Sequence, residues 1–471
     1  FTSSTCGLQI LWSILLSHGT PFLISVGFDG ASTAIVWSIA PICGALVQPW
    51  FGALSDRCHR HNGQRCSFMI RGCVTTSISL IGFSTSRTQV ELLAHHFAGT
   101  YSDSTVGAYT KVNCLTWFFL LNVAIQQFQM ASRAVIIENN KVFDQLTVNA
   151  WASRMQSLGG ILGFLLGSIP LSQNLPSNVT TNFTALCLLG IVVLVMSTMI
   201  SAYFIMGNSD ADSETSSENV GGFVNEIAAM PRQFWQILTI QFFAWLEWFP
   251  FRTYYTSWLA GYMVYSTNTA DFEVDIQDYA ARLGSIAGLY FSMVAFTVNC
   301  FPPLIITFLD GALKSKANIS ASWEHPKTST KAMLLVWLAS YLYSAFALLL
   351  AGMISSQTGI VLLVSSLGIS WAVTLWVPFC LIGILQSRKE ATRFNNGVAG
   401  NNRPQQLGLV VGLHNAAISI SQVLSAIVCS VIFTIWSDTR EGILMALIAG
   451  GCWKLVASFA LWIFFADLQV I

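Results

Sequence analysis

Residues 122–138, NVAIQQFQMASRAVIIE, place an arginine inside a segment that is otherwise apolar enough to lie in lipid. Four polar residues recur in it at i, i+4, i+7 and i+11: Asn122, Gln126, Gln129 and Arg133. On a helix these residues form one stripe that faces a single direction. A charge at the bilayer centre costs about 2.5 to 3.5 kcal/mol on insertion scales, so such an arginine usually faces a water-filled cavity or a carboxylate. The stripe therefore predicts a solute pathway. The alternative is a structural arginine that a neighbour neutralises or that reaches the membrane surface.

The composition is that of a polytopic membrane protein. Of the 471 residues, 54% are hydrophobic and 9% are charged, whereas soluble domains carry about 25% charged residues. The formal net charge is zero, so nothing in the charge balance indicates a nucleic-acid partner. The eleven cysteines are scattered and show no disulfide spacing. One cluster of possible metal ligands matches no standard structural site, so no metal is expected there: Cys58, His59, His61 and Cys66.

Twelve segments meet the requirement of about 20 apolar residues for a helical membrane span. They lie near residues 6–26, 31–54, 67–84, 112–137, 150–171, 184–206, 234–256, 282–309, 331–354, 358–386, 406–434 and 443–466. The Ser-rich, acidic stretch at 207–233 predicts a flexible linker. The expected domains are therefore an N-terminal six-helix half (1–206), a cytoplasmic linker (207–233) and a C-terminal six-helix half (234–471).

The distribution of Lys and Arg predicts the orientation. Loops and helix ends after even-numbered spans carry fifteen of these residues, and those after odd-numbered spans carry four. By the positive-inside rule, the even loops and both termini are expected in the cytoplasm. Two glycosylation sequons, at Asn178 and Asn182, then fall in a loop assigned to the outside. A third, at Asn318, falls on the cytoplasmic side and is expected to be unused.

Two halves of six spans suggest an all-α membrane protein of the major-facilitator plan, in which parallel halves enclose a site near the midplane. The internal repeat is faint: Gly-Ala-Leu closes the second span at 52–54 and the eighth at 311–313. The loop QPWFGALSDR at 48–57 also resembles the G-x-L-x-D-R loop of major-facilitator transporters. Gly52 would allow close helix approach, and Asp56 can cap a helix or pair with a cation. We expect a cytoplasmic gate formed by Gly52, Asp56, Arg57 and Arg65; the alternative is an ordinary charged loop.

Seven segments, in matching order and spacing from end to end, resemble the sucrose-transporter family, and in particular its fungal branch of general α-glucoside permeases. They are GLQILWS at 7–13, GTPFL at 19–23, APICGALVQPWFGALSDR at 40–57, NAWASRM at 149–155, QFFAWLEWFPF at 241–251, GISWAVTLWVPF at 368–379 and GLHNAAISISQ at 412–422. The resemblance implies a major-facilitator fold and proton-coupled uptake of sucrose, maltose or related glucosides at the plasma membrane.

The same segments contain groups suited to a sugar, because aromatic faces stack on pyranose rings and amides pair with hydroxyl groups. The seventh span repeats the polar stripe, and Pro250 is expected to break that helix beside a cavity. Tryptophans near span ends are more often interfacial, so Trp371 and Trp376 are weaker candidates. The expected substrate-binding residues are Asn122, Gln126, Gln129, Arg133, Gln241, Trp245, Trp248, His414, Asn415 and Gln422.

The chain departs from the family at positions tied to proton coupling. The family usually has an Asp in an L-D-V-A-like run of the fourth span, where this chain has Asn122, and an amide cannot titrate. Fungal members tend to have a Glu where Leu15 stands. Glu247, in the seventh span, occupies a position where the family usually has a small residue. Desolvation favours the protonated form of a buried carboxyl group, which a proton site needs.

We therefore hypothesise that Glu247 replaces the missing Asp as proton carrier, or acts as counter-ion to Arg133 or Arg252. The alternative is that coupling is lost and Glu247 balances an arginine. The expected proton-coupling residues are Glu247, Glu138 and Arg133.

Three functions follow from these observations. The first is a proton-coupled sugar symporter of the plasma membrane, with protons as coupling ion and no cofactor. The second is an uncoupled facilitator or a carrier of another neutral solute, and the third is a non-transporting sugar sensor. Sensors of this kind usually signal through long cytoplasmic tails, and only a few residues follow the last span. No paired nucleophile and base, metal cluster or phosphate loop predicts an enzyme. The partners are a sugar and the lipid bilayer, and a monomer is sufficient.

Overall fold

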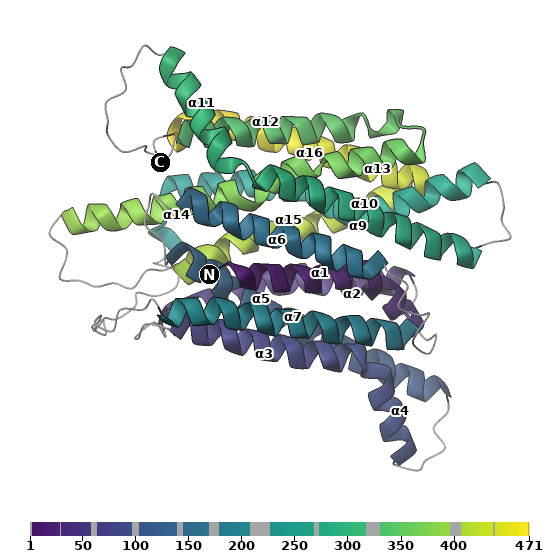
Figure 1. Ribbon diagram of the computed structural model, residues 1–471. Helices are drawn as coiled ribbons and strands as arrows, with labels where there is room; N and C mark the ends of the chain where they lie inside the picture. The colour runs from purple at the N-terminus through teal and green to yellow at the C-terminus, as the bar shows by residue number, and fades with distance from the viewer. Residues whose placement is uncertain are drawn as a thin grey trace. The chain divides into compact units, whose positions relative to one another are not determined.

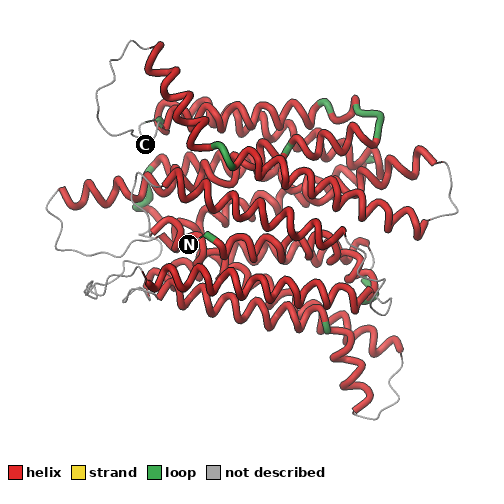
Figure 2. The backbone as a smooth tube through the Cα atoms, viewed as in Figure 1, coloured by secondary structure: helices red, strands yellow, loops and turns green. Residues whose placement is uncertain are grey.

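The apolar segments of the sequence form helices. The computed structural model describes residues 2–28, 30–57, 64–96, 103–138, 145–168, 179–207, 227–267, 273–316, 330–395, 407–436, 439–469 and 471. Within these ranges the chain is almost entirely helical and has no β-strand (Figure 2). Lipid cannot form hydrogen bonds with the backbone, whereas a helix pairs its own N–H and C=O groups. Apolar segments in a membrane are therefore stable as helices.

The helices follow one another along the chain as labelled in Figure 1. They are α1 (Ser3–Ser25), α2 (Gly30–Arg57), α3 (Gln64–Ser84), α4 (Ser86–His96), α5 (Asp103–Glu138), α6 (Gln145–Ser168), α7 (Val179–Gly207), α9 (Arg232–Thr267), α10 (Glu273–Asn299), α11 (Pro302–Lys316), α12 (Thr330–Leu349), the short 3-10 helix η4 (Ala351–Met353), α13 (Gln357–Ser366), α14 (Gly368–Asn395), α15 (Leu407–Ile435) and α16 (Thr439–Leu468). Each of the twelve predicted segments falls on one of these helices or on a pair of them.

Three polar helices stand apart from the rest. Eight helical segments in the described ranges are long and apolar enough by themselves to cross a membrane, and a ninth is obtained if α10 and α11 form one span bent by 50°. The bend lies where Pro302, which lacks an N–H group, begins α11. The remaining long helices are α5, α6 and α9. Of these, α5 and α9 carry most of the polar residues that the sequence marked as functional, and α6 carries Arg154.

The chain packs as two compact units. Unit 1 contains Phe1–Val135, Gly159–Glu214 and Gly408–Ser419, and unit 2 contains Ile136–Leu158, Thr215–Leu407 and Ile420–Ile471. Parts of α6 and α15 belong to each unit. The expected halves, 1–206 and 234–471, stay a prediction.

In unit 1, α7 packs along both α1 and α3 (Figure 1). Three buried aromatic rings join these helices, with Phe22 of α1 stacked on Phe183 of α7 at 4.4 Å and 5.1 Å from Phe83 of α3. Such ring pairs add about 0.5 to 1.5 kcal/mol to the burial of their area.

In unit 2, α16 packs along α9 and α12, and α10 packs on α9 and α14. The buried core of these helices is centred on Trp248, whose ring lies 4.9 Å from that of Trp371 and 5.8 Å from that of Phe251.

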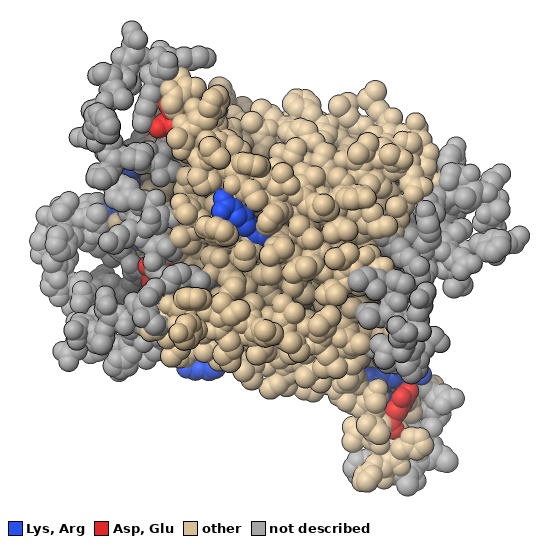
Figure 3. Space-filling view, in the orientation of Figure 1, with Lys and Arg blue, Asp and Glu red and all other residues tan. Residues whose placement is uncertain are grey.

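The described surface suits a lipid environment. On the face shown in Figure 3, uncharged side chains cover most of the described area. Large apolar side chains are exposed on several helices, among them Leu46 of α2, Phe308 of α11 and Trp462 of α16. Exposed apolar side chains in such numbers are costly in water and favourable in a bilayer.

Glycines at a spacing of four residues bring α6 close to α1. A Cβ at Gly159 would lie 2.9 Å from Gln9 Cβ, and one at Gly163 would lie 3.1 Å from the carbonyl oxygen of Ile10. Small residues at this spacing allow close helix contact in membranes.

We therefore predict that Gly163→Leu lowers the stability of the protein by about 1 to 3 kcal/mol, because the larger side chain forces α1 and α6 apart. The measurement is the thermal unfolding midpoint of the detergent-solubilised chain. The matched control is Gly311→Leu, since a Cβ at Gly311 has no neighbour within 4 Å. Equal effects of the two substitutions would contradict this account of the α1–α6 contact.

Candidate functional site

The predicted polar stripe of α5 belongs to unit 1 and is largely buried. Asn122, Gln126 and Arg133 are buried, and Gln129 is half-buried. Asn122 donates to the carbonyl oxygen of Phe118 one turn earlier, at 2.8 Å. Its own side-chain oxygen is buried and has no hydrogen-bond partner among the described residues. Buried polar atoms normally have a partner, so this oxygen is suited to a solute hydroxyl or a water molecule.

Asn415 of α15 connects the stripe to two other helices. Its amide nitrogen donates to the side-chain oxygen of Gln126 at 3.3 Å, to Ser419 Oγ at 3.3 Å and to the carbonyl oxygen of Gly44 in α2 at 3.5 Å. Its oxygen accepts from Gln129 at 3.4 Å. These distances are long for N–H···O hydrogen bonds, which are usually 2.7 to 3.2 Å. The network thus consists of long hydrogen bonds between uncharged groups.

Two further polar residues of this region are buried. His414, next to Asn415, is 2% exposed. Gln48 of α2 is 1% exposed, and its side-chain oxygen has no hydrogen-bond partner in the described part of the chain. The sequence did not single out Gln48, because it lies within the motif that was interpreted as a gate.

Glycines allow α2 and α15 to approach closely enough for these contacts. A Cβ at Gly412 would lie 2.7 Å from Pro49 Cα and 2.9 Å from the carbonyl oxygen of Gln48. A Cβ at Gly52 would overlap the backbone of Gly408. The close approach expected for Gly52 is therefore present, and α15 is the helix that it contacts.

Asp56, near the end of α2, holds the beginning of α15. Its carboxylate accepts from the backbone N–H groups of Gly408 at 2.9 Å and Leu409 at 2.8 Å, the first N–H groups of α15. It also accepts from Arg65 of α3 at 2.8 Å, and both side chains of this ion pair are buried. A carboxylate at a helix N-terminus is favourable because it meets both unpaired N–H groups and the positive end of the helix dipole. Three of the predicted gate residues thus lie together; Arg57 is the last residue of α2, and its side chain is outside the described residues.

The polar residues predicted on α9 lie in unit 2. Trp245 donates through its indole N–H to the side-chain oxygen of Gln241 at 3.1 Å, and its ring lies 5.7 Å from that of Trp371. Trp248 is fully buried in the core of this unit, and Gln422 is half-buried on α15. The guanidinium carbon of Arg252 lies 4.6 Å from the centre of the Trp371 ring. Trp245, which is half-buried, is therefore better placed than Trp248 to offer a ring face to a ligand.

The expected break at Pro250 is wrong, because α9 continues through this residue to Thr267. A proline inside a helix leaves the carbonyl oxygen four residues earlier without its N–H donor. In α9 this is the oxygen of Leu246, and Ser425 Oγ of α15 donates to it at 2.8 Å. A neighbouring helix thus supplies the missing hydrogen bond, as happens in membrane interiors.

The sequence did not identify the partner of Glu247. The carboxylate forms an ion pair with Lys454 of α16 and accepts from Ser344 of α12, and both charged side chains are fully buried. Arg252, which was considered as a counter-ion, lies over Trp371 and forms no ion pair with Glu247 among the described residues. Glu138, the other expected acid, is the last residue of α5 and is half-buried.

Arg154 of α6 is a second residue that sequence reasoning missed, because it was counted only as a loop charge. Its guanidinium group donates to the carbonyl oxygens of Asn299 at 2.7 Å and Cys300 at 2.9 Å, where α10 ends. Asn299 in turn donates to Ser157 Oγ at 3.1 Å. The bend between α10 and α11 frees carbonyl groups, and Arg154 binds two of them.

The remaining predicted residues add less. Asn182 lies in the first turn of α7 and is half-buried, whereas Asn178 and Asn318 lie outside the described residues. Cys58, His59 and His61 also lie outside them.

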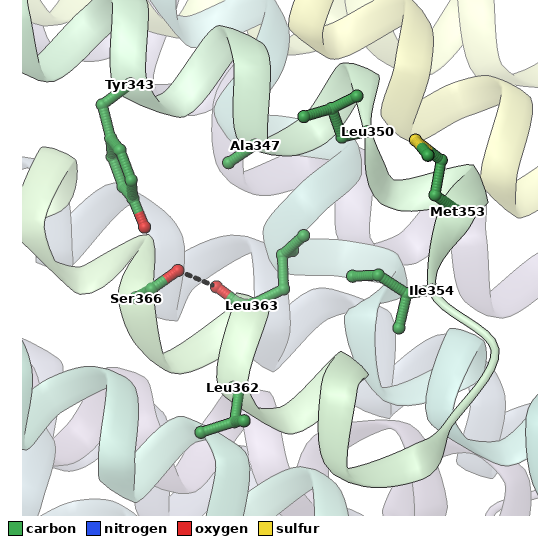
Figure 4. A pocket seen from close by; sticks show the side chains of 8 residues that line it. All are labelled: Tyr343, Ala347, Leu350, Met353, Ile354, Leu362, Leu363 and Ser366. Atoms are coloured by element: carbon green, nitrogen blue, oxygen red, sulfur yellow. Dashed lines mark hydrogen bonds between the residues drawn. The ribbon is translucent and has the colours of Figure 1, made fainter.

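A groove of 540 Å³ in unit 2 is unsuited to a sugar. It is lined by α12, η4 and α13, and Figure 4 shows Leu350, Met353, Ile354 and Leu362 around it. Ser366 is one of its few polar groups, and its hydroxyl donates to the backbone oxygen of Leu363 at 2.7 Å (Figure 4). Sugar hydroxyls would find few partners there, so the polar network of α5 and α15 is the better candidate site.

Comparison with known proteins agrees with a transport site. No protein-family profile matches the chain. The chain is 25% identical over 496 aligned positions to the general α-glucoside permease of Schizosaccharomyces pombe, and the match covers 92% of this chain and 86% of that protein. It is 26% identical over 457 positions to the sucrose transport protein SUT2 of Oryza sativa subsp. indica, covering 90% and 84%. The chain is a homologue of these membrane transporters.

Two solved structures have a similar fold. A bacterial homologue of the iron transporter ferroportin in an outward-facing state has a TM-score of 0.58 at 12% identity and covers 98% of this chain and 99% of its own. The human organic anion transporter MFSD10 has a TM-score of 0.55 at 13% identity and covers 98% of each chain. The predicted all-α fold of major-facilitator type is thereby confirmed, whereas the count of twelve spans stays a prediction.

We predict that Asp56→Ala destabilises the transporter by about 3 to 5 kcal/mol, because Arg65 and two N–H groups of α15 lose the carboxylate that they share. The measurement is the thermal unfolding midpoint. The control is Glu91→Ala, which removes an exposed ion pair with Arg87 in the same unit and should cost less than about 1 kcal/mol. An Asp56 variant as stable as the control would refute the role of Asp56 at the start of α15.

Proposed function

We propose that this transporter carries sucrose or a related α-glucoside such as maltose across the plasma membrane, with both termini in the cytoplasm. The observation that carries the proposal is the amide network of Gln126, Gln129 and Asn415 in a homologue of sugar permeases. An amide side chain both donates and accepts, as a sugar hydroxyl does, so one can replace the other in a network without leaving an atom unpaired.

The proposed substrate-binding residues fall into two groups. In unit 1 they are Asn122, Gln126, Gln129, Arg133, His414 and Asn415. In unit 2 they are Gln241, Trp245 and Gln422, with Trp248 supporting Trp245 from within the core. The first group is rich in hydrogen-bond donors and acceptors, and the second contains an aromatic face of the kind that stacks on a pyranose ring.

The contacts of Asp56 are proposed as the cytoplasmic gate. The carboxylate joins α2 and α3 to the beginning of α15 through charge-assisted hydrogen bonds, which are about twice as strong as neutral ones. Movement of α15 away from α2 requires the bonds from Gly408 and Leu409 to break together. These bonds therefore stabilise the closed state relative to the open state, and a carrier that alternates between two states needs such a difference.

Proton-coupled symport is the mode that the family resemblance implies. The buried ion pair of Glu247 and Lys454 favours a second mode, uncoupled facilitation, because a carboxylate that already has a cationic partner does not require a proton. Asn122, where the family usually has an Asp, favours the same mode.

We predict that cells expressing this chain take up labelled sucrose or maltose and that Arg133→Ala abolishes most of this uptake. Uptake is measured at acid and neutral pH, with and without a protonophore. Higher uptake at acid pH that collapses with the protonophore identifies a symporter, and uptake indifferent to both identifies a facilitator. The control is Arg87→Ala, an exposed arginine outside the stripe. If neither sugar is taken up although the protein is present at the cell surface, the proposed substrate class is wrong.

We also predict that Asn415→Ala reduces kcat/KM for the transported sugar by about 5- to 150-fold, equivalent to about 1 to 3 kcal/mol, because several amide contacts are lost. Asn113→Ala is the matched control. Asn113 lies on the same helix as the stripe but binds Ser86 and Gln89 instead. An unchanged kcat/KM for Asn415→Ala would exclude this network from the substrate site.

A further inference from the structure

A buried carboxylate and a buried ammonium group form an ion pair inside unit 2, and neither is exposed to solvent. Glu247 lies in the middle of α9 and Lys454 in the middle of α16, and both side chains have 0% exposure. Ser344 of α12 donates to the other carboxylate oxygen. The two helices are close at this level because a Cβ at Gly450 would lie only 3.4 Å from Glu247 Cα.

Aromatic rings enclose the ammonium group of Lys454. Its nitrogen lies 4.1 Å from the centre of the Tyr341 ring and 4.5 Å from that of Trp248. A cation over a ring face within about 6 Å is attracted to it, and the attraction is stronger when the cation is desolvated. The lysine therefore has three partners that hold it in place: one carboxylate and two ring faces.

This environment accounts for the charges on both groups. A buried charge without a partner is strongly unfavourable, and breaking a buried ion pair by removing one member leaves such a charge. The titratable groups that contact Glu247 or Lys454 among the described residues are each other and Tyr341 of α12. Each charge is thus neutralised by the other.

We propose that Lys454 is a tethered cation that takes the place of a coupling ion at Glu247. The lysine balances the carboxylate throughout the transport cycle, so Glu247 has no need to bind and release a proton from solution. The consequence for transport rests on the proposed function, whereas the ion pair itself can be tested without any substrate.

The test is the pH dependence of stability in three variants of the full chain in detergent. In Lys454→Met, Glu247 must hold a proton to remain buried, so the folded state binds one proton more than the unfolded state. Its unfolding constant then rises with pH relative to wild type, by up to about tenfold per pH unit. In Glu247→Gln, Lys454 must lose a proton, so the unfolding constant falls with pH by up to the same factor. In the double variant, the unfolding constant should depend on pH as it does in wild type.

The proposal is supported if, relative to wild type, the pH dependence of the unfolding constant changes in opposite directions in the two single variants and does not change in the double variant. If the unfolding constants of both single variants depend on pH as in wild type, the proposal is overturned. If Lys454→Met does not fold, recovery of folding in the double variant supports the proposal, and failure of the double variant together with a parallel Glu247→Gln overturns it. The matched control is Lys331→Met, which removes an exposed lysine from α12 in the same unit and should run parallel to wild type.

Transport adds a second readout that separates this proposal from the proposed function. With Lys454 replaced by Met, sugar uptake should become more dependent on acid pH than in wild type, because Glu247 then needs a proton. An unaltered pH profile in an active Lys454→Met transporter would overturn the assigned role of the lysine. If no sugar is transported by any variant, the proposed substrate class fails while the stability slopes still decide the ion pair.

Discussion

The absence of water in the bilayer interior is the constraint on which the polar parts of this structure depend. Each buried charge must find its partner within the protein. Asp56 accepts from Arg65 and from the first N–H groups of α15, and Glu247 pairs with Lys454. Arg154 binds carbonyl groups that the bend after α10 leaves free. The polar contacts therefore occur where helices end, bend or approach closely.

Much of the fold follows from sequence patterns that act locally. Apolar length predicts each span, and the spacing of the stripe predicts that Asn122, Gln126 and Arg133 share one face of α5. Whether a helix continues through a proline was harder to predict, because it depends on contacts with other helices. Pro250 leaves α9 unbroken since Ser425 replaces the lost hydrogen bond, whereas Pro302 begins a new helix at a bend.

The sequence could not predict which residues far apart in the chain contact one another. Glu247 was recognisable as an unusual acid, but Lys454 lies in a distant apolar helix, and no local spacing relates the two. The same holds for Asn415, whose contacts with α2 and α5 depend on the close approach that Gly44 and Gly412 permit. A polar residue can thus be marked as functional from its own segment, while its role depends on segments that only the fold brings beside it.

Two buried side chains, those of Asn122 and Lys454, affect the charge of the interior in the same direction. Asn122 has the size of an Asp, but it replaces one acceptor oxygen by an NH2 donor and cannot carry the charge. Lys454 leaves the carboxylate of Glu247 in place and cancels its charge. Under the proposed function, a neutral sugar would cross an interior in which these two positions contribute no net charge, so neither would have to be protonated when the protein changes state. Because the free energy of a conformational change depends on charges whose surroundings differ between its two states, neutralising both positions makes that change less sensitive to pH.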